Sequence, residues 1–180
     1  MSNIGKQLKL ADLLKEVLNE IGDLANIKPY PWRYHSAFFE GSFFTEKDEM
    51  VRMGVENLSF FKDELKLPPV FNPEENEIYQ VSYSVEDNES QYRKASYKEL
   101  AAILKTVMEF CKEAFQDVER SVGGKPIFLI ASQSKYTQDY APDPQKDALY
   151  KSIILKNLPT TYRSSEIDVK GKRVIVIQKK

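Results

Sequence analysis

The chain has almost none of the residues on which metal and thiol chemistry depend. Among 180 residues there is one cysteine, Cys111, and one histidine, His35. A single cysteine cannot form an intramolecular disulfide, and this pair does not supply the ligands of a structural zinc site. A Ser-His-Asp or Cys-His catalytic device would have to use His35, which lies in an aromatic extended segment. We therefore interpret His35 as a strand histidine and Cys111 as a small core residue on a helix.

Long apolar runs and an excess of one charge are also missing. No segment approaches the roughly 20 apolar residues of a membrane span, and residues 1–9 lack the hydrophobic core of a signal peptide. The 26 basic and 27 acidic side chains give a formal net charge of -1. This balance provides no overall attraction to nucleic acid or to anionic membranes. The sequence thus predicts a cytoplasmic protein with no membrane partner and no metal, and nucleic acid is not an expected partner.

What is present predicts a single domain over residues 1–180. Apolar residues recur on one helical face over 7–21, which indicates an N-terminal helix. Strands are predicted at 34–44, 50–60 and 78–86, and we expect the first to be one continuous strand with phenylalanines on both faces. Residues 62–77 carry three prolines and several charges, so they are predicted to form a loop.

The second half of the chain has clearer boundaries. Ser96 and Glu99 have the spacing of a capping box that opens a long helix, and Gly123 and Gly124 end it. Residues 127–131 are wholly apolar, as in a buried central strand, and Asp143 caps a further helix. A hairpin of strands 162–169 and 173–178 closes the chain. Together these elements predict an α+β fold: a single mixed, mostly antiparallel sheet with helices on both faces.

The element order α-β-β-β-α-β-α-β-β, with its sheet core over residues 34–180, resembles the GNAT-type acyltransferase fold. In that family a Gln/Arg-x-x-Gly-x-Gly/Ala loop opens the long helix and holds the pyrophosphate of acetyl-CoA on backbone amides. The corresponding residues here are Gln91-Tyr-Arg-Lys-Ala-Ser96. The resemblance implies an acetyl-CoA site at Gln91, Arg93 and Ser96. Lys94 stands where the first glycine belongs, and its side chain obstructs close backbone approach.

A second short match lies on the last helix. Ala148-Leu149-Tyr150 is similar to a family step in which the tyrosine hydroxyl protonates the leaving thiolate, so the resemblance implies Tyr150 as the catalytic acid. The alanine is adjacent to the leucine rather than three residues earlier, and the family's following Gly-Phe is absent. The alternative is that Tyr150 is a helix residue with its ring in the core. Glu56 and Glu86 are either bases for such a reaction or solubilising charges.

The C-terminal half also resembles small α/β proteins of large bacteriophages, which look like degenerate relatives of the acyltransferase fold. This resemblance implies a non-catalytic binding or assembly protein without a cofactor, acting as a virion or host-interaction component in the virion or the host cytoplasm. Its expected contacts are a protein partner or self-assembly through Trp32, Tyr34, Phe38 and Phe39, because aromatic residues are enriched at interfaces. These rings could equally fill the core. The alternative function is an acyl-CoA-dependent N-acyltransferase with a divergent pyrophosphate loop.

Overall fold

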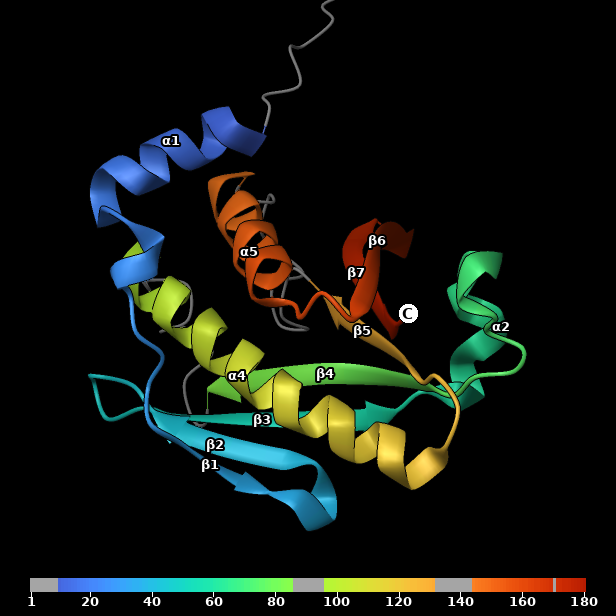
Figure 1. Cartoon of the computed structure of the whole chain (residues 1–180). Coiled ribbons are helices and arrows are strands. Elements are labelled where there is room, and N and C mark those ends of the chain that lie inside the picture. The colour runs from blue at the N-terminus through green and yellow to red at the C-terminus, as the bar shows by residue number, and fades with distance from the viewer. Residues whose placement is uncertain (1–9, 86–95, 132–143, 170) are drawn as a thin grey trace, which may run out of the picture.

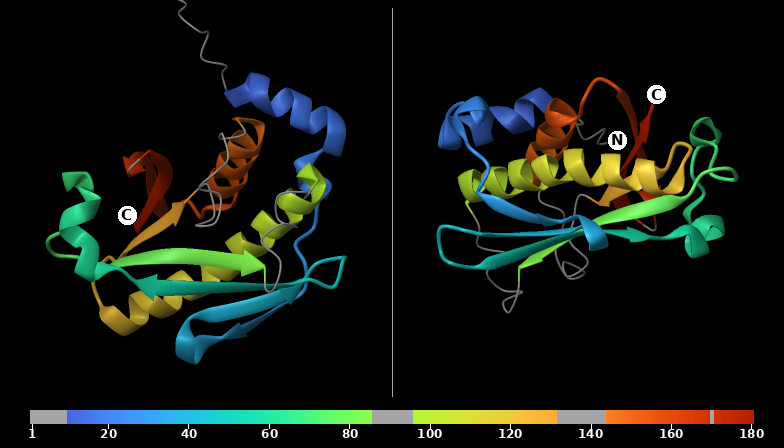
Figure 2. Two further views of the ribbon diagram at one scale, coloured as in Figure 1. Left: turned by 180° about the vertical axis from the view of Figure 1, so that it is seen from behind. Right: turned by 60° about the horizontal axis from the view of Figure 1, so that its bottom comes forward.

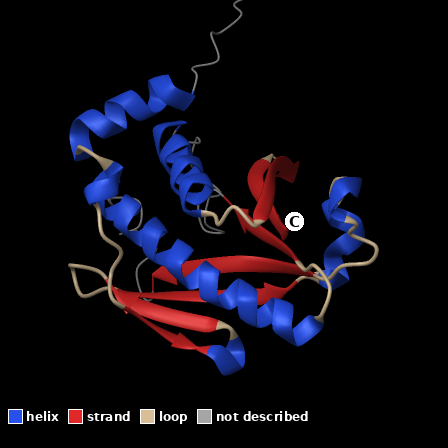
Figure 3. Ribbon diagram, viewed as in Figure 1, coloured by secondary structure: helices blue, strands red, loops and turns tan. Residues whose placement is uncertain are grey.

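The computed structural model describes residues 10–85, 96–131, 144–169 and 171–180, and its strands form one seven-stranded sheet (Figure 3). The strand order is β1-β2-β3-β4-β5-β7-β6, and among these described strands only β4 and β5 are parallel neighbours. The strands are β1 (Trp32–His35), β2 (Glu40–Phe44), β3 (Met50–Asn57), β4 (Ile78–Val85), β5 (Ile127–Ala131), β6 (Tyr162–Val169) and β7 (Lys172–Lys179). The expected mixed, mostly antiparallel sheet is therefore confirmed.

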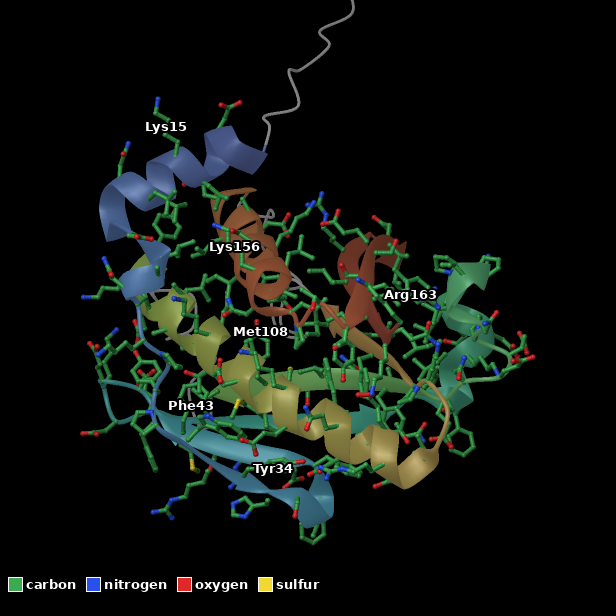
Figure 4. The ribbon with its side chains drawn as sticks, in the orientation of Figure 1. Lys15, Tyr34, Phe43, Met108, Lys156 and Arg163 are labelled. Atoms are coloured by element: carbon green, nitrogen blue, oxygen red, sulfur yellow. The ribbon has the colours of Figure 1, made fainter. Side chains whose placement is uncertain are left out.

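Three long helices lie together on one face of this sheet (Figures 1 and 2). They are α1 (Leu10–Ile21), α4 (Tyr97–Val122) and α5 (Pro144–Asn157). Buried apolar side chains from all three join those of the sheet in one large core (Figure 4 labels Phe43 and Met108). Among the described residues, the helical elements on the opposite face are the four-residue helix α2 (Lys62–Leu65) and short 3-10 turns. Helices thus occur on both faces, but every long helix that the structure describes is on the same one.

The cap that the sequence predicts for α4 is present at its first turn. The hydroxyl of Ser96 accepts a 3.2 Å hydrogen bond from the amide of Glu99. At the other end Gly123 has a φ of 67°, a conformation that glycine adopts without a steric penalty, and its amide bonds the carbonyl of Glu119. Between these ends an apolar stripe faces the sheet, so α4 is held by both capping and burial.

The predicted single strand over 34–44 is wrong, because the segment folds back on itself. β1 and β2 form an antiparallel hairpin in which Trp32 pairs with Phe43 and Tyr34 with Gly41. A 3-10 turn, Ser36–Phe38, joins them, and Phe39 follows it in the left-handed region with a φ of 51°. No glycine, proline or asparagine occupies this turn, so the usual sequence signal of a hairpin is missing.

Residues 58–77, here termed the cover segment, are more than the predicted loop. They contain α2 and two 3-10 turns and pack Leu67 and Phe71 onto the sheet face opposite α4, against β5 and β7. Gln178 is 1% exposed, and its side-chain amide donates to the carbonyls of Phe71 at 3.0 Å and Lys125 at 2.9 Å. Arg163, labelled in Figure 4, donates a 2.7 Å bond to the carbonyl of Val70. These bonds fix the cover segment on one end of the sheet.

Candidate functional site

Tyr150 is the first candidate site residue, and the fold places it inside the core. Ala148, Leu149 and Tyr150 are each at most 2% exposed on the inner face of α5. The Tyr150 hydroxyl donates a hydrogen bond to the carbonyl of Ala131, the last residue of β5. This hydroxyl therefore joins α5 to the end of a central strand.

The residues expected to hold acetyl-CoA are only partly within the described chain. Gln91, Arg93 and Lys94 lie outside the described residues, as do Asp143 and Glu86. Ser96 is described, and its hydroxyl caps α4 by accepting from the Glu99 amide. Glu56, an expected base, points to the sheet face opposite α4, whereas Tyr150 lies on the α4 side. The structure does not bring Tyr150 and Glu56 together.

Three of the four expected interaction aromatics pack against the core. The rings of Trp32 and Tyr34 meet the ring of Phe110 on α4 edge-on, with centroids 6.0 and 5.9 Å apart. Phe39 is half-buried against the same core, whereas Phe38 is 72% exposed. The hydroxyl of Tyr34 lies 2.6 Å from Asp117, and burial together with this carboxylate raises the pKa of Tyr34. Of the four, only Phe38 offers a largely exposed ring to a partner.

A different surface lies on the other side of the β1–β4 strands. Because side chains alternate along a strand, the residues between the core positions all point away from α4. We term this surface the polar sheet face. It consists of Arg33, His35, Glu40, Ser42, Arg52, Gly54, Glu56, Gln80, Ser82 and Ser84, with the apolar pair Phe44 and Met50 at one end. Its residues are exposed or half-exposed, since the cover segment packs on β5, β7 and Ile78 instead.

The strand registers arrange this face in rows. Arg33, Ser42, Arg52 and Ser84 are successive cross-strand neighbours and form the arginine row. The next line across the same strands is the glycine row, formed by His35, Glu40, Gly54 and Ser82. Neighbouring side chains in a row have Cβ atoms about 4.5–5.5 Å apart, and Gly54 interrupts the glycine row because it has no side chain.

A hollow of about 370 Å³ opens on this face, lined by residues of both rows, with Glu56 and Met50 beyond them. Gly54 supplies its floor: a Cβ atom there would lie 3.6 Å from the Ser82 hydroxyl and 4.0 Å from Cγ of Glu40, which is ordinary contact. Glu40 flanks the hollow on β2, and Glu56 flanks it on β3. Sequence patterning could place Arg52, Gly54 and Glu56 on one side of β3, but the hollow depends on register with β2 and β4.

Other chemistries find little support in the described part of the chain. Its histidine, cysteine and acidic residues include no group of three that could hold a metal ion. None of the described helices is long and apolar enough to cross a membrane. Two basic side chains of the closing hairpin are paired with acids: Arg173 lies 2.5 Å from Asp147, and Lys179 lies 3.8 Å from Glu119.

Comparison of the chain with family models, with curated proteins and with solved structures found no match. The assignment of a function therefore rests on the residues described above.

Proposed function

We propose that this chain is a non-catalytic binding or assembly protein. The observation that carries the proposal is the environment of Tyr150. A general acid must come within hydrogen-bond reach of the leaving group, and it works with a base placed nearby. The Tyr150 ring is 2% exposed, its hydroxyl is bonded to Ala131, and Glu56 lies across the sheet. These positions favour a structural role for the tyrosine.

The scaffold in this proposal is a degenerate GNAT-like one. It is supported by the passage from β4 through α4 to the parallel strand β5, followed by α5 and the antiparallel pair β6–β7. The hairpin between β1 and β2 adds one strand to the order expected from the sequence. A role as a virion or host-interaction component is the form of assembly that the bacteriophage-type resemblance implies.

One observation favours the alternative, an acyl-CoA-dependent N-acyltransferase. In the described pairing, residues 78–81 of β4 lie beside residues 127–130 of β5. Beyond it β4 continues to Val85, whereas β5 ends at Ala131, the residue that Tyr150 bonds. The tyrosine hydroxyl thus lies at the carboxyl end of β5, where the described parallel pairing ends, and ligands of open α/β sheets bind beyond the carboxyl ends of strands.

Calorimetric titration with acetyl-CoA, joined to an assay of free CoA release with a panel of amines, separates the two functions. We expect no heat of binding at millimolar acetyl-CoA and no release. Saturable binding with turnover would overturn the proposal, provided that Tyr150→Phe abolishes turnover while the protein stays folded. Tyr162→Phe is the matched control. The Tyr162 hydroxyl also donates a hydrogen bond, to Glu119, but Tyr162 lies on β6.

A further inference from the structure

We propose that a second copy of this chain pairs with the open edge of β6, so that the sheets of the two copies join through antiparallel β6 strands. The inference rests on the proposed binding and assembly function and names its partner. β6 is the last strand of the described sheet, with β7 on one side and no described strand on the other. Such an edge is a template for pairing with another chain.

The backbone of β6 directs every second residue toward this edge. In an antiparallel pair, alternate residues bond the partner strand, and the amides and carbonyls of the residues between them point away. The amide of Lys180 donates to the carbonyl of Thr161 at 2.8 Å, so Thr161 is a position that bonds β7. The amide of Tyr162 donates instead to Pro159, at 3.0 Å, which agrees with this alternation. The outward positions of β6 are therefore Tyr162, Ser164, Glu166 and Asp168.

The backbone groups of three outward positions are available for a partner. Ser164, Glu166 and Asp168 are exposed, and their amides and carbonyls have no hydrogen-bond partner among the residues that the structure describes. Natural edge strands are commonly protected by proline, by lysine or by a bulge. β6 contains neither proline nor lysine, and its register with β7 continues without a bulge. The edge therefore lacks three of the usual barriers to strand pairing.

The charged side chains of β6 are each held by a group of the same chain. They are Arg163, 2.7 Å from the Val70 carbonyl, Glu166, 2.7 Å from Lys151, and Asp168, which accepts from the Gly171 amide at 2.8 Å. The other end of the sheet differs in length: β1 has 4 residues, whereas β6 has 8. Of the two described edges, β6 thus offers the longer ladder to a partner.

The sequence of β6 is complementary to itself in one register. A twofold axis perpendicular to the sheet at Ser165 sets this residue opposite its own copy, Ser164 opposite Glu166, and Tyr162 opposite Asp168. Outward positions then meet outward positions, and each contact that lies off the axis occurs twice, as a twofold interface requires. An axis at Glu166 would instead set two carboxylates directly opposite each other, which is destabilising. An axis at Ser164 shortens the paired segment, so Ser165 is the expected centre.

The first test is a concentration series of the full chain in sedimentation velocity. A single added strand pair is smaller than a standard interface of about 800 Å² per partner, so the series must extend to high micromolar protein. Ser164→Pro removes an outward amide and leaves the bonds to β7 in place, a position where an edge strand tolerates proline. We expect it to weaken self-association at least tenfold while circular dichroism stays that of the wild type. Ser164→Ala keeps the amide and is the matched control.

The second test reads the register and does not depend on the proline variant. Residues that face each other without bonding in an antiparallel pair have Cα atoms about 4.5 Å apart, within the range of roughly 4.4–6.8 Å that a disulfide spans. Ser165→Cys should therefore form an intermolecular disulfide when diamide oxidises the two thiols. Ser164→Cys is the control, because the two Ser164 positions lie about 8 Å apart in this register. The native Cys111 is 1% exposed and does not compete.

The outcomes separate this inference from the proposed function. A wild-type protein that stays monomeric throughout the series overturns the inference, and so does a dimer that Ser164→Pro leaves intact. Cross-linking of Ser164→Cys as fast as Ser165→Cys also overturns it, since chance collisions favour Ser164, the more exposed of the two. Each of these results leaves the proposed function standing as long as acetyl-CoA does not bind, because calorimetry tests that function separately.

Discussion

The hydroxyl of Tyr34 on the edge strand β1 donates a 2.6 Å hydrogen bond to the carboxylate of Asp117 on α4. The two residues are 83 positions apart in the sequence. The bond joins β1 to α4 at the edge of the core, where the ring of Tyr34 also contacts the ring of Phe110. An edge strand pairs with a neighbouring strand on one side only. Side-chain hydrogen bonds of this kind therefore contribute much of the attachment of β1 to the core.

Tyr34→Phe removes that bond and keeps the ring. We expect the free energy of unfolding, measured by urea titration, to fall by about 1 kcal/mol, the usual net contribution of a protein hydrogen bond. The nearby Phe38→Ala is the control, because its side chain is 72% exposed and its loss should change stability by less than about 0.5 kcal/mol. A larger loss for Phe38→Ala than for Tyr34→Phe would contradict the placement of these two side chains.

Two glycines on the same sheet should differ in their tolerance of alanine. A Cβ atom at Gly41 would lie 3.0 Å from the Arg33 carbonyl and 3.0 Å from the Phe110 ring, whereas one at Gly54 meets nothing closer than 3.6 Å. Gly41→Ala therefore overpacks the contact of β2 with α4 and should cost about 1–3 kcal/mol. Gly54→Ala should leave the thermal midpoint within about 2 °C of wild type. Equal effects at the two positions would be inconsistent with the close approach at Gly41.

Part of this fold could be predicted from the sequence, and part could not. Alternation in β3 and β4, the capping residue Ser96 and the apolar run of β5 are local signals, and each led to the correct element. The β1–β2 hairpin escaped prediction because its left-handed residue is Phe39, a residue type that rarely adopts that conformation. The arginine and glycine rows depend on the register of four strands, which no local pattern encodes. Tyr150 could be placed on its helix, but the acceptor of its hydroxyl could not be known before the fold.

Gln178 anchors the cover segment through a buried side-chain amide. Its replacement by alanine leaves the carbonyls of Phe71 and Lys125 without these donors, and we expect a loss of about 2–3 kcal/mol from two such bonds. Gln178→Leu is the matched variant, since it keeps much of the side-chain volume but can neither donate to the two carbonyl oxygens nor accept from Arg163. It should destabilise the protein about as much as Gln178→Ala. Equal stability of Gln178→Ala and wild type in urea would show that the amide does not hold the segment.

Cys111 gives a prediction on pH. Burial raises the pKa of its thiol in the folded state, and the side chain is 1% exposed. The unfolded chain retains the ordinary value of about 8.5, so below that pH both states are protonated and stability is complete. Above it the unfolded thiol ionises while the folded thiol stays neutral, and stability falls by up to about 1.4 kcal/mol per pH unit. Cys111→Ala should flatten the pH dependence of the urea midpoint between about pH 8.5 and about pH 10.

The thiol also reports on opening of the core. A thiol reagent should react with Cys111 only through unfolding, because the thiolate is the reacting form and burial suppresses it. Rapid labelling of the native protein at pH 8 would contradict its burial on α4.

The parallel pair β4–β5 has a consequence for the order of folding. β1 to β4 are linked as neighbours in sequence, and so are β6 and β7, so each group can form through short chain closures. Pairing Ile78 with Ile127 instead closes a loop of about 50 residues, whose entropy must be lost before the contact gives any stabilisation. The junction of the two groups should therefore form late, after α4 has packed on β1 to β4. Substitutions in β5 should then mainly accelerate unfolding, whereas those in β3 should also slow folding.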